Sequence, residues 1–370
     1  MTPQIFVSYA RSDQEQVIPG ALTQRTNVAT AAYLSFQAGF HALKQDPGRG
    51  DSIAMECWRE SMRLDPNFGA PYLGLARQAL WLGTWDGRPR SPEQIGLQVA
   101  SLLAVARERE SHPADLAETE GWAALVGGWD WPLAYQKFTK AKSMRGVSSG
   151  LGWYYLVVEG RDVEAEKELK GAAGHEAFIG FPSQGEAWVA NHKGDWQTVI
   201  DTLSRDGLGN RRAETQFILA EAAARAGRHG DAKALIDQIK SSEAHSILVA
   251  TRALVAALAG DEAGALKALG LLQVATSESL PFLVMAKTWL ALGDVEATLE
   301  ALEQGLGQRG SWPMLGIRSA VFLQGLGEEA RYWEIVSRMK LPELPVYHPF
   351  FEREQRGRLG GAAATSSGVN

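Results

Sequence analysis

The chain has 370 residues, of which 45% are hydrophobic and 22% are charged, and its formal net charge is −6. This composition is typical of a folded protein and excludes general disorder. Acidic and basic residues are mixed along the chain, and the lack of a basic stripe argues against direct binding to nucleic acid. The single cysteine, Cys57, excludes a disulfide framework, so we expect a small buried hydrophobe in a reducing compartment.

The ends and the apolar runs of the sequence suggest a cytoplasmic protein. The N-terminus lacks a basic segment followed by an apolar core, so no signal peptide is expected. No apolar run reaches the ~20 residues that cross a bilayer. We therefore expect no membrane association.

Residues 1–25 start with a short β-rich run, Ile5 to Tyr9, which is followed by polar residues. A single strand cannot satisfy its backbone groups, so we expect this segment to be poorly structured. The stretch IFVSYARSD resembles the first strand and loop of a Toll/interleukin-receptor (TIR) signalling domain. Helical patterning begins near Thr30 and leaves no room for the sheet of that domain or for the glutamate of its NAD-cleaving members. The resemblance therefore implies a remnant or a truncated gene.

Two amphipathic helices are predicted next, from Thr30 to Gln45 and from Asp51 to Leu64. The second has a small residue, an aromatic residue four later, a small residue three later and a proline five beyond: Ala54, Trp58, Ser61 and Pro66. This pattern resembles the second helix of a tetratricopeptide repeat (TPR). A further helix is predicted from Pro71 to Gly83, and its partner begins at Pro92 or Glu93.

The segment from Leu116 to Ala141 continues the same pattern. Its Trp-Asp-Trp turn at residues 129–131 is followed by small and aromatic residues at TPR spacing: Ala134, Phe138 and Ala141. This segment resembles the repeat region of bacterial proteins that join a TIR, winged-helix or nucleotide-cyclase module to a C-terminal TPR array. The similarity extends from about Ala31 to Pro342.

A ladder of glycines dominates the second half of the chain. The glycines recur at intervals of 34, 33, 33, 33 and 34 residues: Gly160, Gly194, Gly227, Gly260, Gly293 and Gly327. Each closes an apolar helical run, where a left-handed residue can end a helix. A period in the low thirties indicates an array of helix pairs that are too small to bury their own apolar faces.

Two further features recur with each glycine. An aspartate follows within a few residues and is expected to cap the next helix: Asp162, Asp195, Asp231, Asp261 and Asp294. Small or apolar residues follow five, nine and twelve positions after the glycine, as in Ala165, Leu169 and Ala172 or Ala265, Leu269 and Leu272. Spacings of four and three place them on one stripe that faces the preceding helix.

These patterns predict an all-α protein, an α-α superhelix of antiparallel helix pairs like a TPR solenoid, over residues 26–342. In such an array each pair contacts only its neighbours. Residues 343–370 are expected to form a capping segment and a disordered tail. Tyr347, Phe350 and Phe351 would cover the last apolar face, although a frayed tail is the alternative.

Several short catalytic patterns lack the context that their chemistry requires. Residues 146–150 fit the G-x-S-x-G elbow of serine hydrolases, which needs a preceding strand, but here they join two helices. Residues 305–310 fit G-x-G-x-x-G but follow a helix. The seven histidines lack metal-ligand spacing, and no phosphate-binding P-loop occurs. We therefore expect no catalytic constellation, no cofactor and no metal.

The remaining candidate for function is the concave surface. In TPR arrays the first helix of each pair lines the groove, and the resemblance places eleven residues there: Arg77, Trp81, Trp122, Tyr154, Trp188, Asn191, His192, Phe217, Glu221, Arg225 and Lys287. Aromatic and arginine side chains favour protein binding. The expected function is a scaffold that binds a protein or peptide segment, or another copy of itself. The alternative is the regulatory part of a TIR- or cyclase-type signalling protein whose catalytic module is missing or in another chain.

Overall fold

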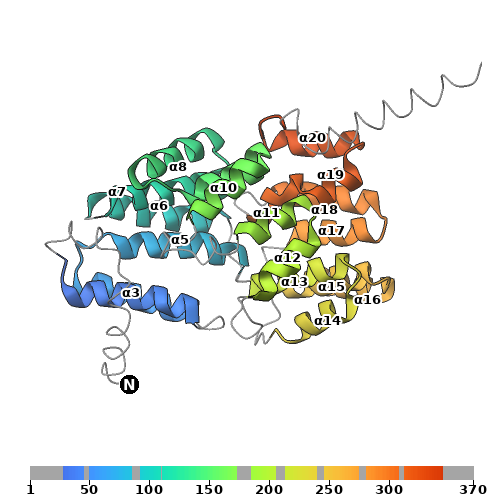
Figure 1. Cartoon of the computed structure of the whole chain (residues 1–370), viewed down its shortest axis with the longest axis horizontal. Helices are drawn as coiled ribbons and strands as arrows, with labels where there is room; N and C mark the ends of the chain where they lie inside the picture. Colours follow the sequence, from blue (N-terminus) through green and yellow to red (C-terminus); the bar gives the residue numbers. More distant parts are fainter. Residues whose placement is uncertain are drawn as a thin grey trace, which may run out of the picture.

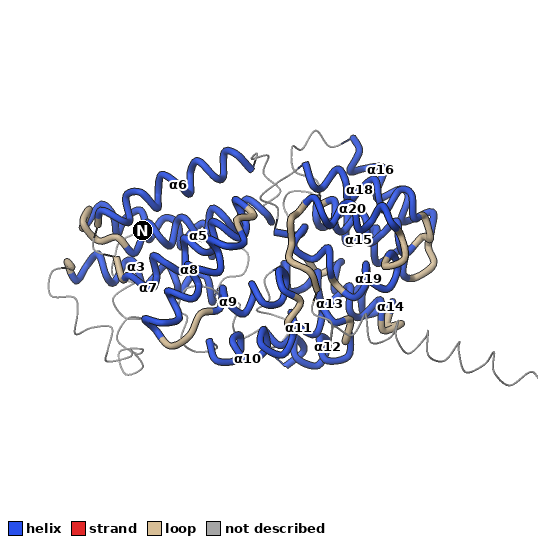
Figure 2. Tube along the Cα trace, turned by 90° about the horizontal axis from the view of Figure 1, so that it is seen from above, coloured by secondary structure: helices blue, strands red, loops and turns tan. Residues whose placement is uncertain are grey.

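The computed structural model describes residues 28–45, 50–85, 92–109, 111–172, 185–205, 213–239, 246–274, 281–307 and 312–344. Over these ranges the chain forms helices and no β-strand, which confirms the all-α prediction (Figure 2). The predicted strand at residues 5–9 and the aromatic cap at residues 347–351 lie outside the described residues. None of the described helices combines the length and the apolar character needed to cross a lipid bilayer.

The first region of the array runs from α3 to α10 (Figure 1). Its α-helices pack as the consecutive pairs α3 with α4, α5 with α6, α7 with α8 and α9 with α10. Two of the first helices continue into π-helical turns, η1 and η2. The bounds are α3 (Thr30–Gln45), α4 (Gly50–Leu64), α5 (Ala70–Trp85), α6 (Pro92–Glu108), α7 (Pro113–Trp122), η1 (Ala123–Gly128), α8 (Trp131–Arg145), α9 (Ser149–Tyr154), η2 (Tyr155–Glu159) and α10 (Asp162–Ala172).

The second region runs from α11 to α20 and repeats the pairing, α11 with α12, α13 with α14, α15 with α16 and α17 with α18. A 3-10 helix, η5, takes the place of a regular first helix before α19. The bounds are α11 (Gly185–Lys193), α12 (Trp196–Arg205), α13 (Ala213–Arg225), α14 (His229–Asp237), α15 (Ser246–Leu258), α16 (Glu262–Val274), α17 (Phe282–Ala291), α18 (Val295–Gly307), η5 (Trp312–Arg318), α19 (Ala320–Leu326) and α20 (Ala330–Arg338).

The ladder glycines end helices as predicted, and all but one have the expected left-handed backbone. Five have φ between 65° and 81°: Gly160, Gly194, Gly227, Gly260 and Gly293. Gly327 also ends its helix, α19, but the left-handed conformation expected there is wrong, because its φ is −60°. There, the indole Nε1–H of Trp333 donates to the Gly327 carbonyl at 2.7 Å. Because a side chain satisfies a carbonyl at this helix end, a left-handed residue is not required.

The aspartates that follow the glycines cap the next helix in three of the five cases. A carboxylate oxygen accepts from a backbone N–H three residues later at Asp195, Asp261 and Asp294. The prediction is wrong for Asp231, which lies inside α14 and pairs with Arg228 instead. It is also wrong for Asp162, whose carboxylate oxygen Oδ1 has no hydrogen-bond partner among the described residues.

The predicted packing stripe is buried. Its small residues, such as Ala165, Ala232 and Ala265, are 0% exposed. The knob, four residues after the small residue, is aromatic in two helices of the first region, Trp58 in α4 and Phe138 in α8, and aliphatic in α10, where it is Leu169. Each ring lies between glycines of the two flanking first helices, Gly39 and Gly74 for Trp58, and Gly121 and Gly150 for Phe138. In α14, α16 and α18 the knob is aliphatic: Ile236, Leu269 and Leu302.

The array closes on itself, which corrects the expectation that each pair contacts only its neighbours. The last helices return beside the middle of the chain (Figure 1), where η5 contacts η2 and α19 contacts α11. The Arg318 guanidinium donates to the Val158 carbonyl at 3.2 Å, and the Trp131 indole donates to the Met339 carbonyl at 2.9 Å. The second region therefore forms a closed turn against the end of the first.

Candidate functional site

The closed turn surrounds a pocket of about 110 Å³. Its walls come from the first helix of each successive pair, together with η2 and η5, and one residue from each wall shows the pattern: Trp153, Trp188, Phe217, Thr251, Leu283 and Leu315. Most of the lining is apolar. The rings of Trp153 and Trp188 meet edge to face, with centroids 5.1 Å apart.

A buried ion network forms one side of this pocket. The Lys287 ammonium of α17 donates to the Glu221 carboxylate of α13 at 2.8 Å, and Arg225 donates to the other oxygen of Glu221 at 2.9 Å. Burial by itself would raise the pKa of Glu221, but the charges and hydrogen bonds of Lys287 and Arg225 outweigh it and lower this pKa. Glu221 is therefore ionised at neutral pH, and the pair joins helices on either side of α15.

Two oxygen atoms in the wall have no hydrogen-bond partner among the described residues. They are Asn191 Oδ1 in α11 and Ser319 Oγ, directly before α19. Ser319 is 5% exposed and occupies the N-cap position of α19, yet its hydroxyl makes no cap bond. Buried polar groups are usually satisfied, so such atoms in a pocket wall indicate a place for a ligand group or water.

A second buried pair lies beside the pocket. His192, which lines it, is 4.0 Å from the carboxylate of Asp162 at the start of α10, measured from Nδ1 to Oδ1. Burial raises the pKa of Asp162 to about 6, with a further rise from Glu164 and Glu166 and an opposing effect of Lys193. This carboxyl group therefore titrates close to neutral pH.

The structure brings six of the eleven predicted residues together. The pocket is lined by Trp188, Asn191, His192, Phe217, Glu221 and Lys287. Arg225 stands next to it through its bond to Glu221, and its guanidinium lies over the Trp196 ring, 5.2 Å from the centroid. Most of these side chains are buried in the closed turn and do not form an open surface.

The other four predicted residues lie in the first region, where each contacts neighbouring helices. Arg77 donates to the Thr119 hydroxyl at 2.8 Å and to the Asp115 carbonyl at 3.2 Å. The Trp122 ring packs edge to face on Phe138, and Tyr154 packs on Tyr135. Trp81 is partly buried in α5. None of the four lines the pocket.

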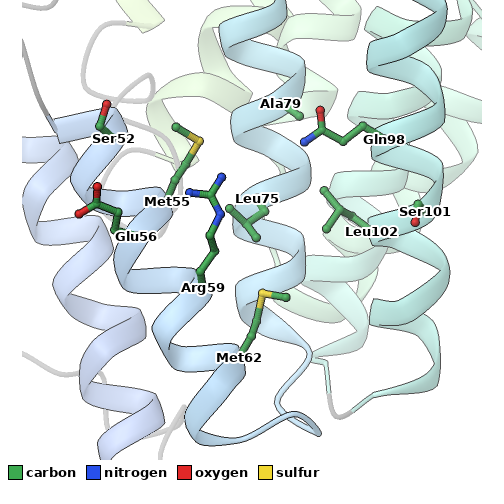
Figure 3. Close-up of a pocket in the computed structure, with 10 residues that line it drawn as sticks. All are labelled: Ser52, Met55, Glu56, Arg59, Met62, Leu75, Ala79, Gln98, Ser101 and Leu102. Atoms are coloured by element: carbon green, nitrogen blue, oxygen red, sulfur yellow. The ribbon is translucent and has the colours of Figure 1, made fainter.

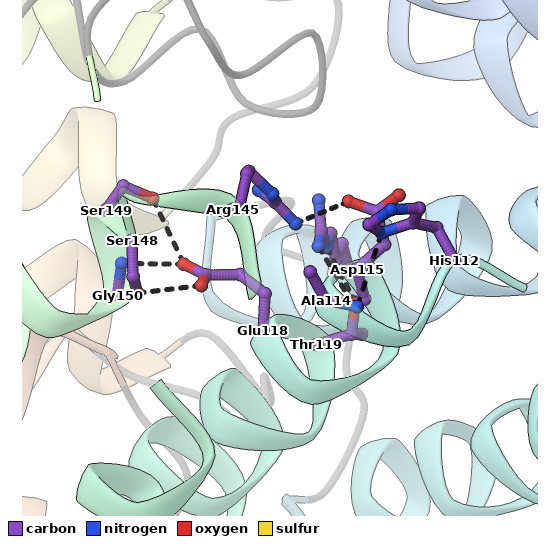
Figure 4. Close-up of polar contacts among 10 residues, drawn as sticks. His112, Ala114, Asp115, Glu118, Thr119, Arg145, Ser148, Ser149 and Gly150 are labelled. Carbon is purple, nitrogen blue, oxygen red and sulfur yellow. Dashed lines mark hydrogen bonds and ion pairs between the residues drawn. The ribbon is translucent and has the colours of Figure 1, made fainter. Parts of the chain in front are cut away.

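The residues of the G-x-S-x-G pattern contribute to helix capping. The Glu118 carboxylate, 1% exposed, accepts from the Ser148 hydroxyl at 2.7 Å and from the Gly150 backbone N–H at 2.8 Å (Figure 4). Ser148 in turn caps α9 by accepting from the Leu151 N–H. The segment joins α8 to α9, as predicted. Its serine is held by a buried carboxylate, and an elbow strand does not precede it.

A second pocket, of about 560 Å³, lies on the first region between α4, α5 and α6 (Figure 3). Methionine and leucine side chains form its floor, including Met55, Met62 and Leu102, and Arg59 and Glu56 stand beside them. It is larger than the first pocket, but its polar lining residues are all exposed on the surfaces of their helices: Ser52, Glu56, Arg59, Gln98 and Ser101. Cys57 of α4 is partly buried, and burial raises the pKa of its thiol.

Sequence reasoning missed Ser319, Trp153 and Leu315. Trp153 precedes the ladder glycine Gly160 by seven residues, a spacing that could have identified it, since Trp188 precedes Gly194 by six. Ser319 and Leu315 have no such signal, because η5 breaks the helical period. Among the described residues, no group of three or more His, Cys, Asp or Glu is arranged to hold a metal ion.

Comparisons with known proteins do not assign the chain to a family. No protein-family model matches it, and no curated protein is significantly similar to it.

Proposed function

We propose that the chain is an interaction scaffold of the tetratricopeptide type, which binds a protein or peptide segment at the concave side of its second region. The observation that supports this is the convergence of the first helices of successive pairs on one pocket that combines tryptophan and phenylalanine rings with charged groups. Such residues dominate binding energy at protein interfaces. A cytoplasmic location, expected from the sequence, is part of the proposal.

The size of the pocket limits the mode of binding. An apolar cavity of about 150 Å³ holds one benzene molecule, so about 110 Å³ accommodates a single side chain. Trp188, Asn191 and Val284 are half-buried and mark where the lining reaches the surface. A partner would insert one anchor there and lay the adjoining residues across the entrance.

A displayed library of random peptides, panned on the purified chain, tests this function. Val284→Phe fills the pocket without removing a polar group, and Trp188→Ala removes an aromatic wall. Leu271→Ala is the control, because Leu271 is 60% exposed on α16 and does not line the pocket. Circular dichroism melts confirm that each variant folds.

We expect the selected peptides to bind the wild-type chain and Leu271→Ala at least about tenfold more tightly than they bind Val284→Phe, because the phenylalanine excludes the anchor from the pocket. A library that yields no binder, or binders that Val284→Phe retains, would contradict binding at this pocket.

A further inference from the structure

The pocket has hydrogen-bonding capacity that the protein does not use. Asn191 Oδ1 and Ser319 Oγ have no partner among the described residues, and the N-cap position of Ser319 would ordinarily engage its hydroxyl. Lys287 donates one of its three ammonium hydrogens to Glu221. The three residues belong to α11, α17 and the start of α19, so they line the pocket from different walls.

The charges around these groups disfavour a charged ligand. A carboxylate in the pocket would gain Lys287 and Ser319 but would meet the Glu221 carboxylate. An ammonium group would gain Glu221 and Asn191 but would meet Lys287, with Arg225 close behind. Since Glu221 and Lys287 are already paired, either ion would lose its hydration for a partly repulsive site.

A wholly apolar group is disfavoured for a different reason. It would leave Asn191 Oδ1 and Ser319 Oγ, which are already buried, without hydrogen bonds, at a cost for each polar group. The best match is an uncharged group that both donates and accepts, carried on a short apolar stem that packs against the aromatic and aliphatic walls.

We propose that the pocket receives a carboxamide, the side chain of a glutamine or asparagine of the partner segment. A carboxamide has its acceptor and its donors on separate atoms, so it can serve two walls together, whereas a hydroxyl serves them from one atom. An amide also pairs with Asn191 whichever way either amide is turned. This inference rests on the proposed function and names the anchor that the same pocket takes.

A series of fragments with nearly equal size and different end groups tests the anchor on the purified chain. The probes are butyramide, butyrate, butylamine, 1-butanol and 2-pentanone, titrated at pH 7.5 and followed by NMR of the tryptophan indole N–H signals. The Trp188 signal is assigned with Trp188→Phe. We expect butyramide to bind about fivefold or more tightly than every other member, because one additional satisfied hydrogen bond gives that ratio.

Two variants and one matched control test whether the preference for butyramide depends on Ser319 and Asn191. Ser319→Ala and Asn191→Leu should each weaken butyramide about threefold to tenfold and leave 2-pentanone nearly unchanged. Thr202→Val is the control, because the Thr202 hydroxyl is also buried without a partner among the described residues but lies in α12, outside the pocket. It should change the affinity for butyramide less than 1.5-fold.

Each other outcome overturns the proposed anchor. Tightest binding of butyrate or butylamine assigns a charged anchor, and equal binding of 1-butanol assigns a hydroxyl. Equal effects of Thr202→Val and Ser319→Ala, or no binding by any fragment, also reject it. The peptide library tests the scaffold function separately. Peptide binders that lack glutamine and asparagine would support the scaffold function and reject the carboxamide anchor. Fragment binding without any peptide binder would reject the scaffold function.

Discussion

The two regions of the array are built from similar helix pairs but differ in the side chains that pack between the helices. Two helices of the first region carry aromatic knobs, which fit because the flanking helices carry glycine where the ring passes, as for Phe138 between Gly121 and Gly150. In the second region, aliphatic knobs pack against alanine-rich helices such as α13 and α15. The rings of Trp58 and Phe138 therefore fill the space between their flanking helices, whereas the first helices of the second region, together with α9, η2 and η5, line the pocket of about 110 Å³.

The inward-facing polar residues differ in the same way. Arg77 of the first region ends on Thr119 and Asp115 within the helix packing. Glu221 and Lys287 of the second region join each other along one side of the pocket. The comparison shows that the position of a residue in a repeat sets its direction, whereas the size of its neighbours decides whether it packs or lines a pocket.

Gly150→Ala, which tests the glycine–aromatic packing of the first region, should give the largest loss of stability. A Cβ at this position would overlap the Phe138 ring, so the variant should lose about 3 kcal/mol or more of unfolding free energy. Urea denaturation measures it. Gly270→Ala in α16 is the matched control: its Cβ meets no atom within 4 Å, and it should gain up to about 1 kcal/mol. Phe138→Leu should restore much of the loss; equal effects of both alanines would refute glycine–aromatic packing.

Lys287→Met tests the polar interior of the second region. The variant leaves Glu221 buried with Arg225 as its remaining partner, and we expect a loss of about 2–3 kcal/mol. Adding Glu221→Gln should recover part of that loss, because a neutral amide needs no cation. The double-variant comparison uses chemical denaturation. A single variant as stable as the wild type would show that the pair does not hold α13 and α17 together.

Ala265→Leu tests the close approach of α15 and α16. Ala265 is 0% exposed, so a larger side chain should overpack the helix pair and cost roughly 1–3 kcal/mol. Leu266→Ala is the control, since Leu266 is 42% exposed beside it. Thermal melts compare the two variants. An unchanged midpoint for Ala265→Leu would contradict the assigned packing stripe.

Asp162→Asn tests the boundary between the regions through its pH dependence. In the folded chain the pKa of Asp162 is about 6, whereas the ordinary pKa of an aspartate is 3.8. Between these values the folded state binds more protons than the unfolded state, so this group makes stability fall as pH rises and reach a plateau above about 6. Asp162→Asn should therefore be more stable than the wild type by about 1–2 kcal/mol at pH 7.5. The difference should disappear near pH 4, as measured by melts across this range.

The smallest expected change in stability is the difference between alanine substitutions at two glycines of the ladder. Gly293→Ala places a Cβ at φ 81° and should cost about 1 kcal/mol. Gly327→Ala keeps φ at −60° and should be neutral within about 0.5 kcal/mol. Equal losses in urea denaturation would show that Gly327 also requires a left-handed backbone.

Much of the fold follows from local signals in the sequence. The glycine period, the caps at Asp195, Asp261 and Asp294, and the stripe around Ala265 are all set within one helix pair, where side-chain geometry decides the outcome. The position six residues before the ladder glycine also identified Trp188, Glu221 and Lys287 as inward-facing, and the structure places them in one pocket. Their role in binding stays a prediction.

Most of the remaining features depend on partners distant in sequence. Arg318 reaches Val158 because small rotations accumulate over several pairs, and the pattern of one helix pair does not contain this information. The case of Gly327 is local, since its partner Trp333 lies only six residues away, but the glycine period carries no signal for a bond from an indole to a helix-end carbonyl. For the same reason the sequence did not distinguish Trp122, which packs on Phe138, from Trp188, which lines the pocket.

The junction of η5 with η2 has a consequence for how the molecule assembles. Residues 158 and 318 are bonded across 160 positions of the chain, so closing this contact costs more loop entropy than closing a local hairpin, and we expect it to form after the hairpins. Helix pairs can nucleate anywhere in an open array, but the pocket also needs the contact of η5 with η2, because both line it. We therefore expect that separating η5 from η2 disrupts the pocket without unfolding the helices.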